Sequence, residues 1–233
     1  MTRPLRLITF DLDDTLWPVG PVIQRAEHRM RDFLDAQAPT VNKRFDRDGM
    51  AVLRDQVLQQ QPQLVHDIST LRRLILKAAL EACGYRNVDA LAEQAFAAFL
   101  DARHDVEYFE DALDTLAYLS RHYTLGALSN GNADIARLGL DQYFSFHLSA
   151  ESVGRRKPDP EMFERALQQA GVGPEAAVHV GDHVDDDIRG AANVGMATIW
   201  VNRPGQPWPE TDVTPTWEIQ ELTELRSILA HSS

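Results

Sequence analysis

A long helical block separates the first strand of this chain from every other strand that its sequence predicts. Leu5–Phe10 is short and apolar and is followed by acidic residues, which is typical of a buried strand. From Pro21 to about Arg103, apolar residues recur at helical spacing, and prolines and a glycine divide the pattern into about four helices. We therefore expect this block to be an insertion that folds as a small all-helical domain.

After the block, strands and helices alternate along the chain. Strands are expected at 124–128, 147–149, 177–180 and 198–201, and helices near 110–119, after 133, at 160–170, at 188–194 and near 222–229. A loop rich in Pro and Trp is expected before the last helix. Such alternation predicts a parallel sheet with helices on both faces. Residues 1–17 and 104–233 are therefore expected to form a Rossmann-like α/β core, and residues 18–103 the inserted helical domain.

Charge and cysteine content limit the possible partners and compartments. Lys and Arg number 23 against 35 Asp and Glu, which gives a net charge of −12. This charge opposes binding to nucleic acid or to anionic membranes. The single cysteine, Cys83, excludes an intrachain disulfide and fits a reducing compartment. No apolar run is long enough to span a bilayer, so a cytoplasmic protein is expected. The expected oligomeric state is a monomer or a homodimer.

Four short segments carry polar residues where predicted strands end, or soon after. They are Asp11–Thr15, Ser129–Gly131, Arg156–Pro160, and Gly181–Asp182 with Asp187 beyond it. In an open parallel sheet, ligands bind at the carboxyl ends of the strands. The sequence therefore predicts that these segments converge in one crevice.

The first segment contains a pair of acids suited to covalent hydrolysis of a phosphate ester. Asp11 and Asp13 share one face of an extended backbone. One carboxylate can attack phosphorus, and the other can protonate the leaving oxygen and later deprotonate water. We assign Asp11 as the nucleophile and Asp13 as the general acid/base. The alternative is an Asp-rich turn that only caps the next helix.

Two acids that face a phosphate require a cation. Mg²⁺ is the natural choice because it binds carboxylate and carbonyl oxygens together with water. Asp182 is the expected third oxygen donor, and Asp187 is expected to act on the metal through water.

The two middle segments offer groups that can bind a phosphoryl group. Ser129 can donate its hydroxyl, and Asn130 lies beside it. Lys157 can supply the positive charge that stabilises the transferring group. The alternatives are a polar turn for the first two residues and a solvated surface lysine for the third.

Together these motifs resemble those of the haloacid dehalogenase-like (HAD) superfamily, and the helical insertion resembles that family's C1 cap. The resemblance implies Asp11 as nucleophile and Asp13 as acid/base. It implies a Mg²⁺ site formed by Asp11, Asp182 and the Asp13 carbonyl, with Asp187 in support. Ser129, Asn130 and Lys157 are then the phosphate-binding residues. Dehalogenases of the superfamily lack an acid two positions after the nucleophile, so Asp13 favours a phosphatase.

A narrower resemblance is to bacterial phosphatases that act on flavin mononucleotide and on 5-amino-6-(5-phosphoribitylamino)uracil, a riboflavin precursor. It is carried by Phe10–Leu16, Pro21–Ile23, His66–Asp67 and Ser129–Asn132. The expected substrate is a small phosphorylated metabolite. A sugar phosphomutase, another hydrolase of the superfamily and a phospho-accepting signalling module remain open alternatives.

Overall fold

The computed structural model describes residues 4–209 and 212–230, and contacts divide the chain into two compact units. One unit comprises Met1–Pro18 and Glu107–Ser233, and the other comprises Val19–Val106. The sequence predicts boundaries at residues 17 and 103. None of the described helices is both long enough and apolar enough to cross a membrane.

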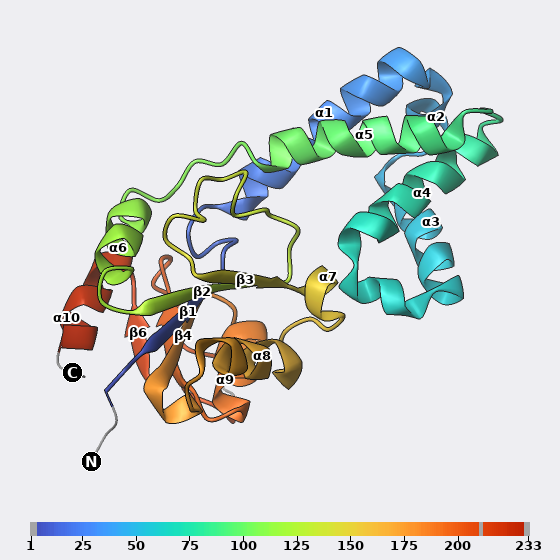
Figure 1. Ribbon diagram of the computed structural model, residues 1–233. Helices are drawn as coiled ribbons and strands as arrows, with labels where there is room; N and C mark the ends of the chain where they lie inside the picture. The colour runs from blue at the N-terminus through green and yellow to red at the C-terminus, as the bar shows by residue number, and fades with distance from the viewer. Residues whose placement is uncertain (1–3, 210–211, 231–233) are drawn as a thin grey trace. The chain divides into compact units, whose positions relative to one another are not determined.

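The first unit is built on a six-stranded parallel sheet in the order β3-β2-β1-β4-β5-β6 (Figure 1). The strands are β1 (Leu7–Phe10), β2 (Thr124–Ser129), β3 (Phe146–Ser149), β4 (Ala177–Gly181), β5 (Ala197–Val201) and β6 (Trp217–Ile219). Its helices are α6 (Ala112–Leu119), α7 (Ala150–Val153), α8 (Pro160–Ala170), α9 (Gly190–Asn193) and α10 (Leu225–Ala230). Short 3-10 turns at Pro174–Ala176 and Leu222–Glu224 and a π-helix at Val184–Arg189 complete it. The predicted α/β core is confirmed.

The register of the sheet aligns the strand ends that carry the polar segments. Phe10, the last residue of β1, lies opposite Ala127 of β2 and Val180 of β4. The chain therefore leaves β1, β2 and β4 at one edge of the sheet. Apolar side chains from β1, β2, β4, α8 and α9 bury one face of the sheet.

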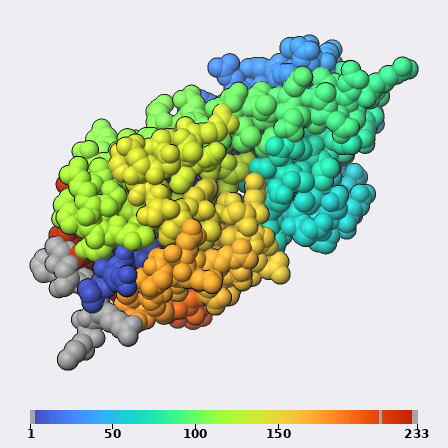
Figure 2. Space-filling model, viewed as in Figure 1, coloured from blue at the N-terminus to red at the C-terminus, as the bar shows by residue number. Residues whose placement is uncertain are grey.

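Some elements differ from the sequence-based prediction. The predicted Pro- and Trp-rich loop contains the edge strand β6, which is only three residues long and has one buried residue. The helix predicted after Ala133 is wrong, because that segment forms turns. There the Asp134 side chain accepts a hydrogen bond from the Ala136 N–H, at 2.9 Å, and Gly139 has a φ of +68°. Such a local hydrogen bond competes with helix formation. This connection between β2 and β3, yellow in Figure 2, lies on the visible face of its unit.

The regular structure of the second unit consists of helices: α1 (Val19–Gln37), α2 (Pro39–Arg44), α3 (Arg47–Gln60), α4 (Ile68–Ala82) and α5 (Val88–Arg103), with a 3-10 turn at Pro62–His66. The sequence predicts about four helices and does not separate α2, which begins at Pro39. Residues of α1, α2, α4 and α5 share one apolar core. This unit therefore buries a core of its own.

Candidate active site

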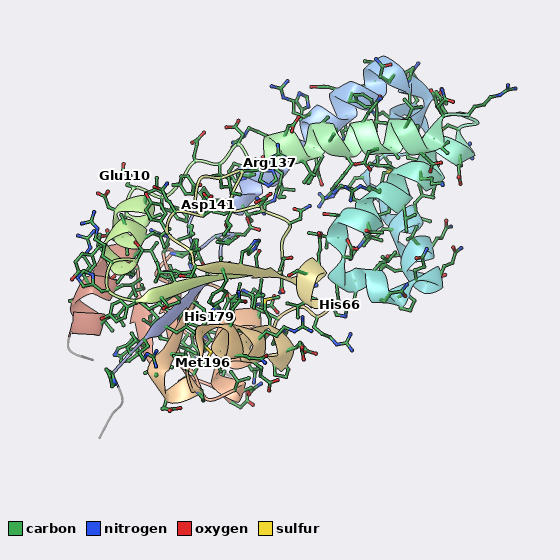
Figure 3. The ribbon with its side chains drawn as sticks, in the orientation of Figure 1. His66, Glu110, Arg137, Asp141, His179 and Met196 are labelled. Atoms are coloured by element: carbon green, nitrogen blue, oxygen red, sulfur yellow. The ribbon has the colours of Figure 1, made fainter. Side chains whose placement is uncertain are left out.

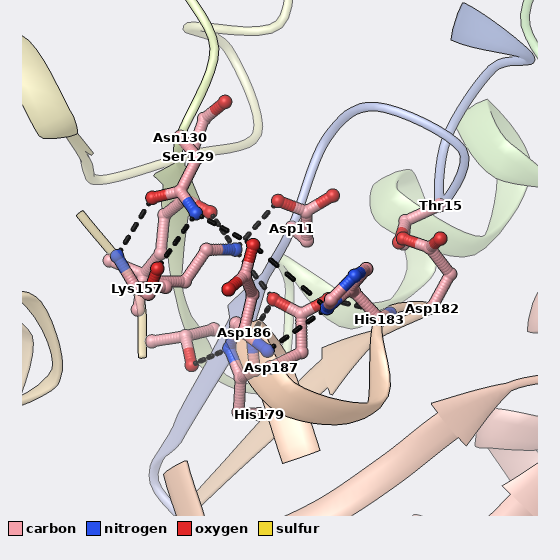
Figure 4. Close-up of polar contacts among 12 residues, drawn as sticks. Asp11, Thr15, Ser129, Asn130, Lys157, His179, Asp182, His183, Asp186 and Asp187 are labelled. Carbon is pink, nitrogen blue, oxygen red and sulfur yellow. Dashed lines mark hydrogen bonds and ion pairs between the residues drawn. The ribbon is translucent and has the colours of Figure 1, made fainter. Parts of the chain in front are cut away.

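Three of the polar segments meet at the ammonium group of Lys157. Its Nζ donates hydrogen bonds to Asp11 Oδ1 at 2.6 Å, to Asp187 Oδ1 at 2.6 Å and to the Leu128 carbonyl at 2.8 Å (Figure 4). Lys157 is 1% exposed. These three bonds use all three donors of the ammonium group. The loop before α8 therefore places a buried cation between acids that follow β1 and β4.

Asp187 is held from several directions below this cation. Besides Lys157, its carboxylate accepts hydrogen bonds from His179 Nε2 at 3.1 Å and from the His183 backbone N–H at 3.0 Å. A Cβ atom at Gly181 would lie 2.3 Å from Asp187 Cγ. Only glycine at position 181 therefore lets β4 end so close to this carboxylate.

His179 is a site residue that the sequence analysis missed. It lies in the middle of β4 (labelled in Figure 3), is fully buried, and packs edge-on against Phe163. Its Nδ1 lies 2.8 Å from Thr9 Oγ1 of β1, and its Nε2 contacts Asp187. A buried polar residue requires hydrogen-bond partners. A histidine inside an otherwise apolar strand was the available signal.

Replacing His179 with leucine is expected to destabilise the protein by about 1–3 kcal/mol, the usual cost of an unsatisfied buried polar group. Both Thr9 Oγ1 and Asp187 Oδ1 lose a partner in this variant. The urea dependence of unfolding measures the effect. His28→Leu is the matched control, because the His28 side chain is 77% exposed and should contribute little. Equal stabilities of the two variants would contradict this role for His179.

Three carboxylates could hold a metal ion. Oxygen atoms of Asp11, Asp182 and Asp187 all lie within 4.8 Å of one another. Asp182 Oδ1 accepts a hydrogen bond of 3.3 Å from Thr15 Oγ1, and the Asp182 carbonyl accepts one of 2.8 Å from Trp200 Nε1 of β5. Such an oxygen-rich cluster fits a hard divalent cation. Among the described residues, this group does not include the Asp13 carboxylate.

Lys157 and Asp187 form the fixed charges of the site. Burial opposes the ammonium group, but Asp11 and Asp187 raise the pKa of Lys157 above its ordinary value. Burial would raise the pKa of Asp187, but Lys157 and His179 hold it well below its ordinary value. Lys157 is therefore charged, and Asp187 is ionised.

Asp11 and Asp182 are in the opposite situation. Burial raises the pKa of Asp11 well above its ordinary value; Lys157 opposes this shift, and the charges of Asp187 and Asp182 add to it. Burial, with the charges of Asp187 and Asp14, raises the pKa of Asp182 to about 7. Without a cation, simultaneous ionisation of both acids is therefore unfavourable near neutral pH, and a divalent ion would favour their ionised forms.

Asp13 follows Asp11 on the same loop but has a different neighbour. Its Oδ1 accepts a hydrogen bond of 2.9 Å from Trp17 Nε1. Asp14 has a φ of 58°, a left-handed conformation in which Asp is tolerated. The loop after β1 therefore forms a tight turn that places an indole N–H on the Asp13 carboxylate.

Ser129 ends β2, and Asn130 follows it beside the Lys157 loop. The Asn130 side chain accepts from Lys157 N at 2.8 Å and donates to the Lys157 carbonyl and to Asp186 Oδ2, both at 3.0 Å. These bonds favour a positioning role for Asn130 over the predicted phosphate contact. Ser129 Oγ accepts a 2.9 Å bond from the Gly131 N–H, which leaves its own proton to donate to a ligand.

Comparison with protein families and with curated proteins gives consistent matches. The family model that matches residues 5–195 is that of the haloacid dehalogenase-like hydrolases. The chain is 34% identical to the 5-amino-6-(5-phospho-D-ribitylamino)uracil phosphatase of Escherichia coli (strain K12), over 97% of this chain and 98% of that protein. It is 27% identical to the glyceraldehyde 3-phosphate phosphatase of Methanopyrus kandleri, over 97% of each chain.

Among solved structures, the chain is similar to one described as a 2-haloacid dehalogenase from Pseudomonas syringae pv. Tomato DC3000. The TM-score is 0.95 and the identity 44%, over 98% of this chain and all of that chain. These relatives therefore agree on the family, and their names describe two different reactions.

Proposed function

The chain belongs to the haloacid dehalogenase-like hydrolases, and we propose that it is a Mg²⁺-dependent phosphomonoester hydrolase that forms a covalent intermediate on Asp11. The contact of Asp11 with Lys157, beside Asp182 and Asp187, carries this proposal. It combines a nucleophile, a fixed cation and a carboxylate cluster for a metal at one edge of the sheet.

The chemistry follows from these contacts. Lys157 holds Asp11 Oδ1, so the other oxygen of Asp11 is oriented to attack phosphorus. The bond from phosphorus to the ester oxygen breaks, and that oxygen takes a proton from Asp13. Water then attacks the aspartyl phosphate, gives its proton to Asp13 and releases inorganic phosphate and free Asp11. The Ser129 hydroxyl would donate to a phosphoryl oxygen, and the positive charge of Lys157 would stabilise the transferring group.

The carboxylate cluster fits Mg²⁺, which has a strong preference for oxygen ligands. Asp11, Asp182 and the main-chain carbonyl of Asp13 would hold the ion. The Asp187 oxygens accept hydrogen bonds from Lys157, His179 and His183, and Asp187 would act on the ion through water. When bound, Mg²⁺ would neutralise part of the phosphoryl charge.

Hydrolytic dehalogenation is the second candidate, because a 44% identical structure carries that description. In that reaction Asp11 would attack carbon, and the halide would leave without taking up a proton. Dehalogenation therefore does not require a general acid. The presence of Asp13, and the phosphatase names of relatives that match almost the whole chain, favour phosphate esters.

The deciding experiment compares phosphate release from p-nitrophenyl phosphate with chloride release from 2-chloropropionate. We expect phosphate release that requires Mg²⁺ and stops with EDTA, and no chloride release above the background of the Asp11→Asn variant. Chloride release at the higher kcat/KM would overturn the proposal.

We further propose a small phosphorylated metabolite as the substrate, with flavin mononucleotide and 5-amino-6-(5-phosphoribitylamino)uracil as the leading candidates. The similarity to the Escherichia coli phosphatase, whose name gives the second compound, supports that candidate. The helical unit Val19–Val106 would act as a cap that excludes water and sets specificity. A screen of phosphorylated metabolites tests the choice, and equally weak activity on all of them would count against the flavin branch.

Mg²⁺ is expected to raise the melting temperature more at about pH 8 than at about pH 6, because metal binding requires ionised carboxylates. The folded-state pKa of Asp182, about 7, exceeds its ordinary value of 3.8. Protonation of Asp182 therefore stabilises the folded protein. This stabilisation is complete below about pH 3.8, and it is lost as the pH rises through about 7. Below that point the Kd for Mg²⁺ should rise about tenfold per pH unit. Thermal unfolding with and without Mg²⁺ measures this, and a pH-independent effect would contradict it.

A further inference from the structure

The contact between Trp17 and Asp13 has no part in the chemistry described so far. Trp17 is fully buried, and its indole N–H donates to Asp13 Oδ1 at 2.9 Å. The backbone supports the same arrangement, because Asp14 N donates to the Trp17 carbonyl at 2.8 Å and Leu16 N donates to the Leu12 carbonyl at 2.8 Å. The turn thus brings the indole back onto the acid that precedes it by four residues.

The Trp17 ring is itself held in place. It packs edge-on against Tyr108, with ring centroids 5.7 Å apart and an interplanar angle of 81°. The Tyr108 hydroxyl donates to the Leu138 carbonyl at 2.9 Å, which ties this ring to the connection after β2. An indole N–H can only donate, and a carboxylate is its strongest kind of acceptor. The Trp17 donor therefore has a fixed position from which it can orient the Asp13 carboxylate.

We propose that Trp17 is a positioning residue that holds Asp13 Oδ1, so that Asp13 Oδ2 carries the proton to the leaving group. The proposal rests on the proposed function of Asp13. As the bond from Asp11 to phosphorus forms and the ester bond breaks, the proton on Oδ2 passes to the departing oxygen. The indole N–H then donates to the Asp13 carboxylate that remains. This hydrogen bond is stronger than the one to the protonated acid, because its acceptor is now charged.

Substrates that differ in their need for a proton test this proposal. The oxygen of p-nitrophenyl phosphate leaves as a stable phenolate, whereas the alkoxide of glycerol 2-phosphate must be protonated. For Trp17→Phe, we expect kcat/KM to fall about 10- to 100-fold on glycerol 2-phosphate but less than about 3-fold on p-nitrophenyl phosphate, since misplacing an acid costs part of its catalytic effect. In an Asp13→Asn background, Trp17→Phe should cause no further loss on glycerol 2-phosphate.

Trp200→Phe is the matched control. It removes another buried indole N–H from the site, but one that is bonded to the Asp182 carbonyl rather than to Asp13. Asp182 would hold the metal ion that binds the phosphoryl group, and both esters contain this group. Trp200→Phe should therefore lower both kcat/KM values by the same factor. If Trp17→Phe does not fold, β-(3-benzothienyl)alanine at position 17 keeps the ring shape and lacks the N–H.

Two outcomes separate this inference from the proposed function. If the wild type hydrolyses neither ester with Mg²⁺, the proposed function fails. If it hydrolyses both, and Trp17→Phe lowers both equally or adds its full loss to that of Asp13→Asn, the positioning role of Trp17 is overturned.

Discussion

Asp11→Asn is expected to lower kcat for p-nitrophenyl phosphate by at least about 10⁴-fold, the scale of loss when a covalent nucleophile is removed. The amide cannot form the acyl phosphate, and no other carboxylate among the described residues accepts a hydrogen bond from Lys157 except Asp187. Asp187 is 1% exposed and also bonded to His179, so it is not placed to replace the nucleophile. Steady-state kinetics with Mg²⁺ measure the loss.

The same variant should fold at least as stably as the wild type. Burial raises the pKa of Asp11, which means that its ionised form is costly in the folded protein. The amide removes that charge and keeps an oxygen that can accept from Lys157. A loss of activity without a fall in melting temperature therefore identifies a chemical role.

Asp14→Asn is the matched control for the loss of one negative charge on this loop. Asp14 is exposed, and asparagine tolerates its left-handed conformation. The control should retain activity close to that of the wild type. An Asp11→Asn variant that keeps most of its activity would rule out the covalent route.

The sequence could predict the meeting of the site residues because it depends on topology. Asp11 and Asp182 follow β1 and β4, and Ser129 is the last residue of β2. These strands are parallel neighbours, and a parallel sheet brings their carboxyl ends to one edge. The helix predicted at 160–170 is also found, because Asp159 caps α8 and Pro160 occupies its first turn. These features depend on local chemistry and strand order alone.

The hydrogen bonds within the site could not be predicted in the same way. His179 and Thr9 lie on neighbouring strands, and only the register shows that their side chains share a face. Asn130 is a plausible phosphate ligand by type, but its amide pairs with the backbone of Lys157, 27 residues away. Strand β6 was missed because three residues carry too little pattern.

Lys157→Met is expected to destabilise the protein by about 3–5 kcal/mol, the cost of leaving a buried ion pair with one partner. In this site both Asp11 and Asp187 lose the cation that each contacts at 2.6 Å. Activity should fall by about 10²- to 10³-fold as well, because a fixed positive charge beside the transferring group is lost. Unfolding in urea without Mg²⁺, together with kinetics on p-nitrophenyl phosphate, measures both effects.

Lys77→Met is the matched control, because it makes the same substitution at an exposed ion pair. It distinguishes the effect of burial from the effect of losing one positive charge. Lys77 contacts Asp89 at the same 2.6 Å, but the two side chains are 38% and 82% exposed. Exposed pairs contribute little to stability, so this variant should unfold close to the wild type. The destabilisation by Lys157→Met should also become smaller as the pH falls through the raised pKa of Asp11, because the protonated Asp11 no longer requires a cation, whereas Asp187 still does. Equal stabilities of the two methionine variants at neutral pH would mean that Lys157 does not hold the acids of the site together.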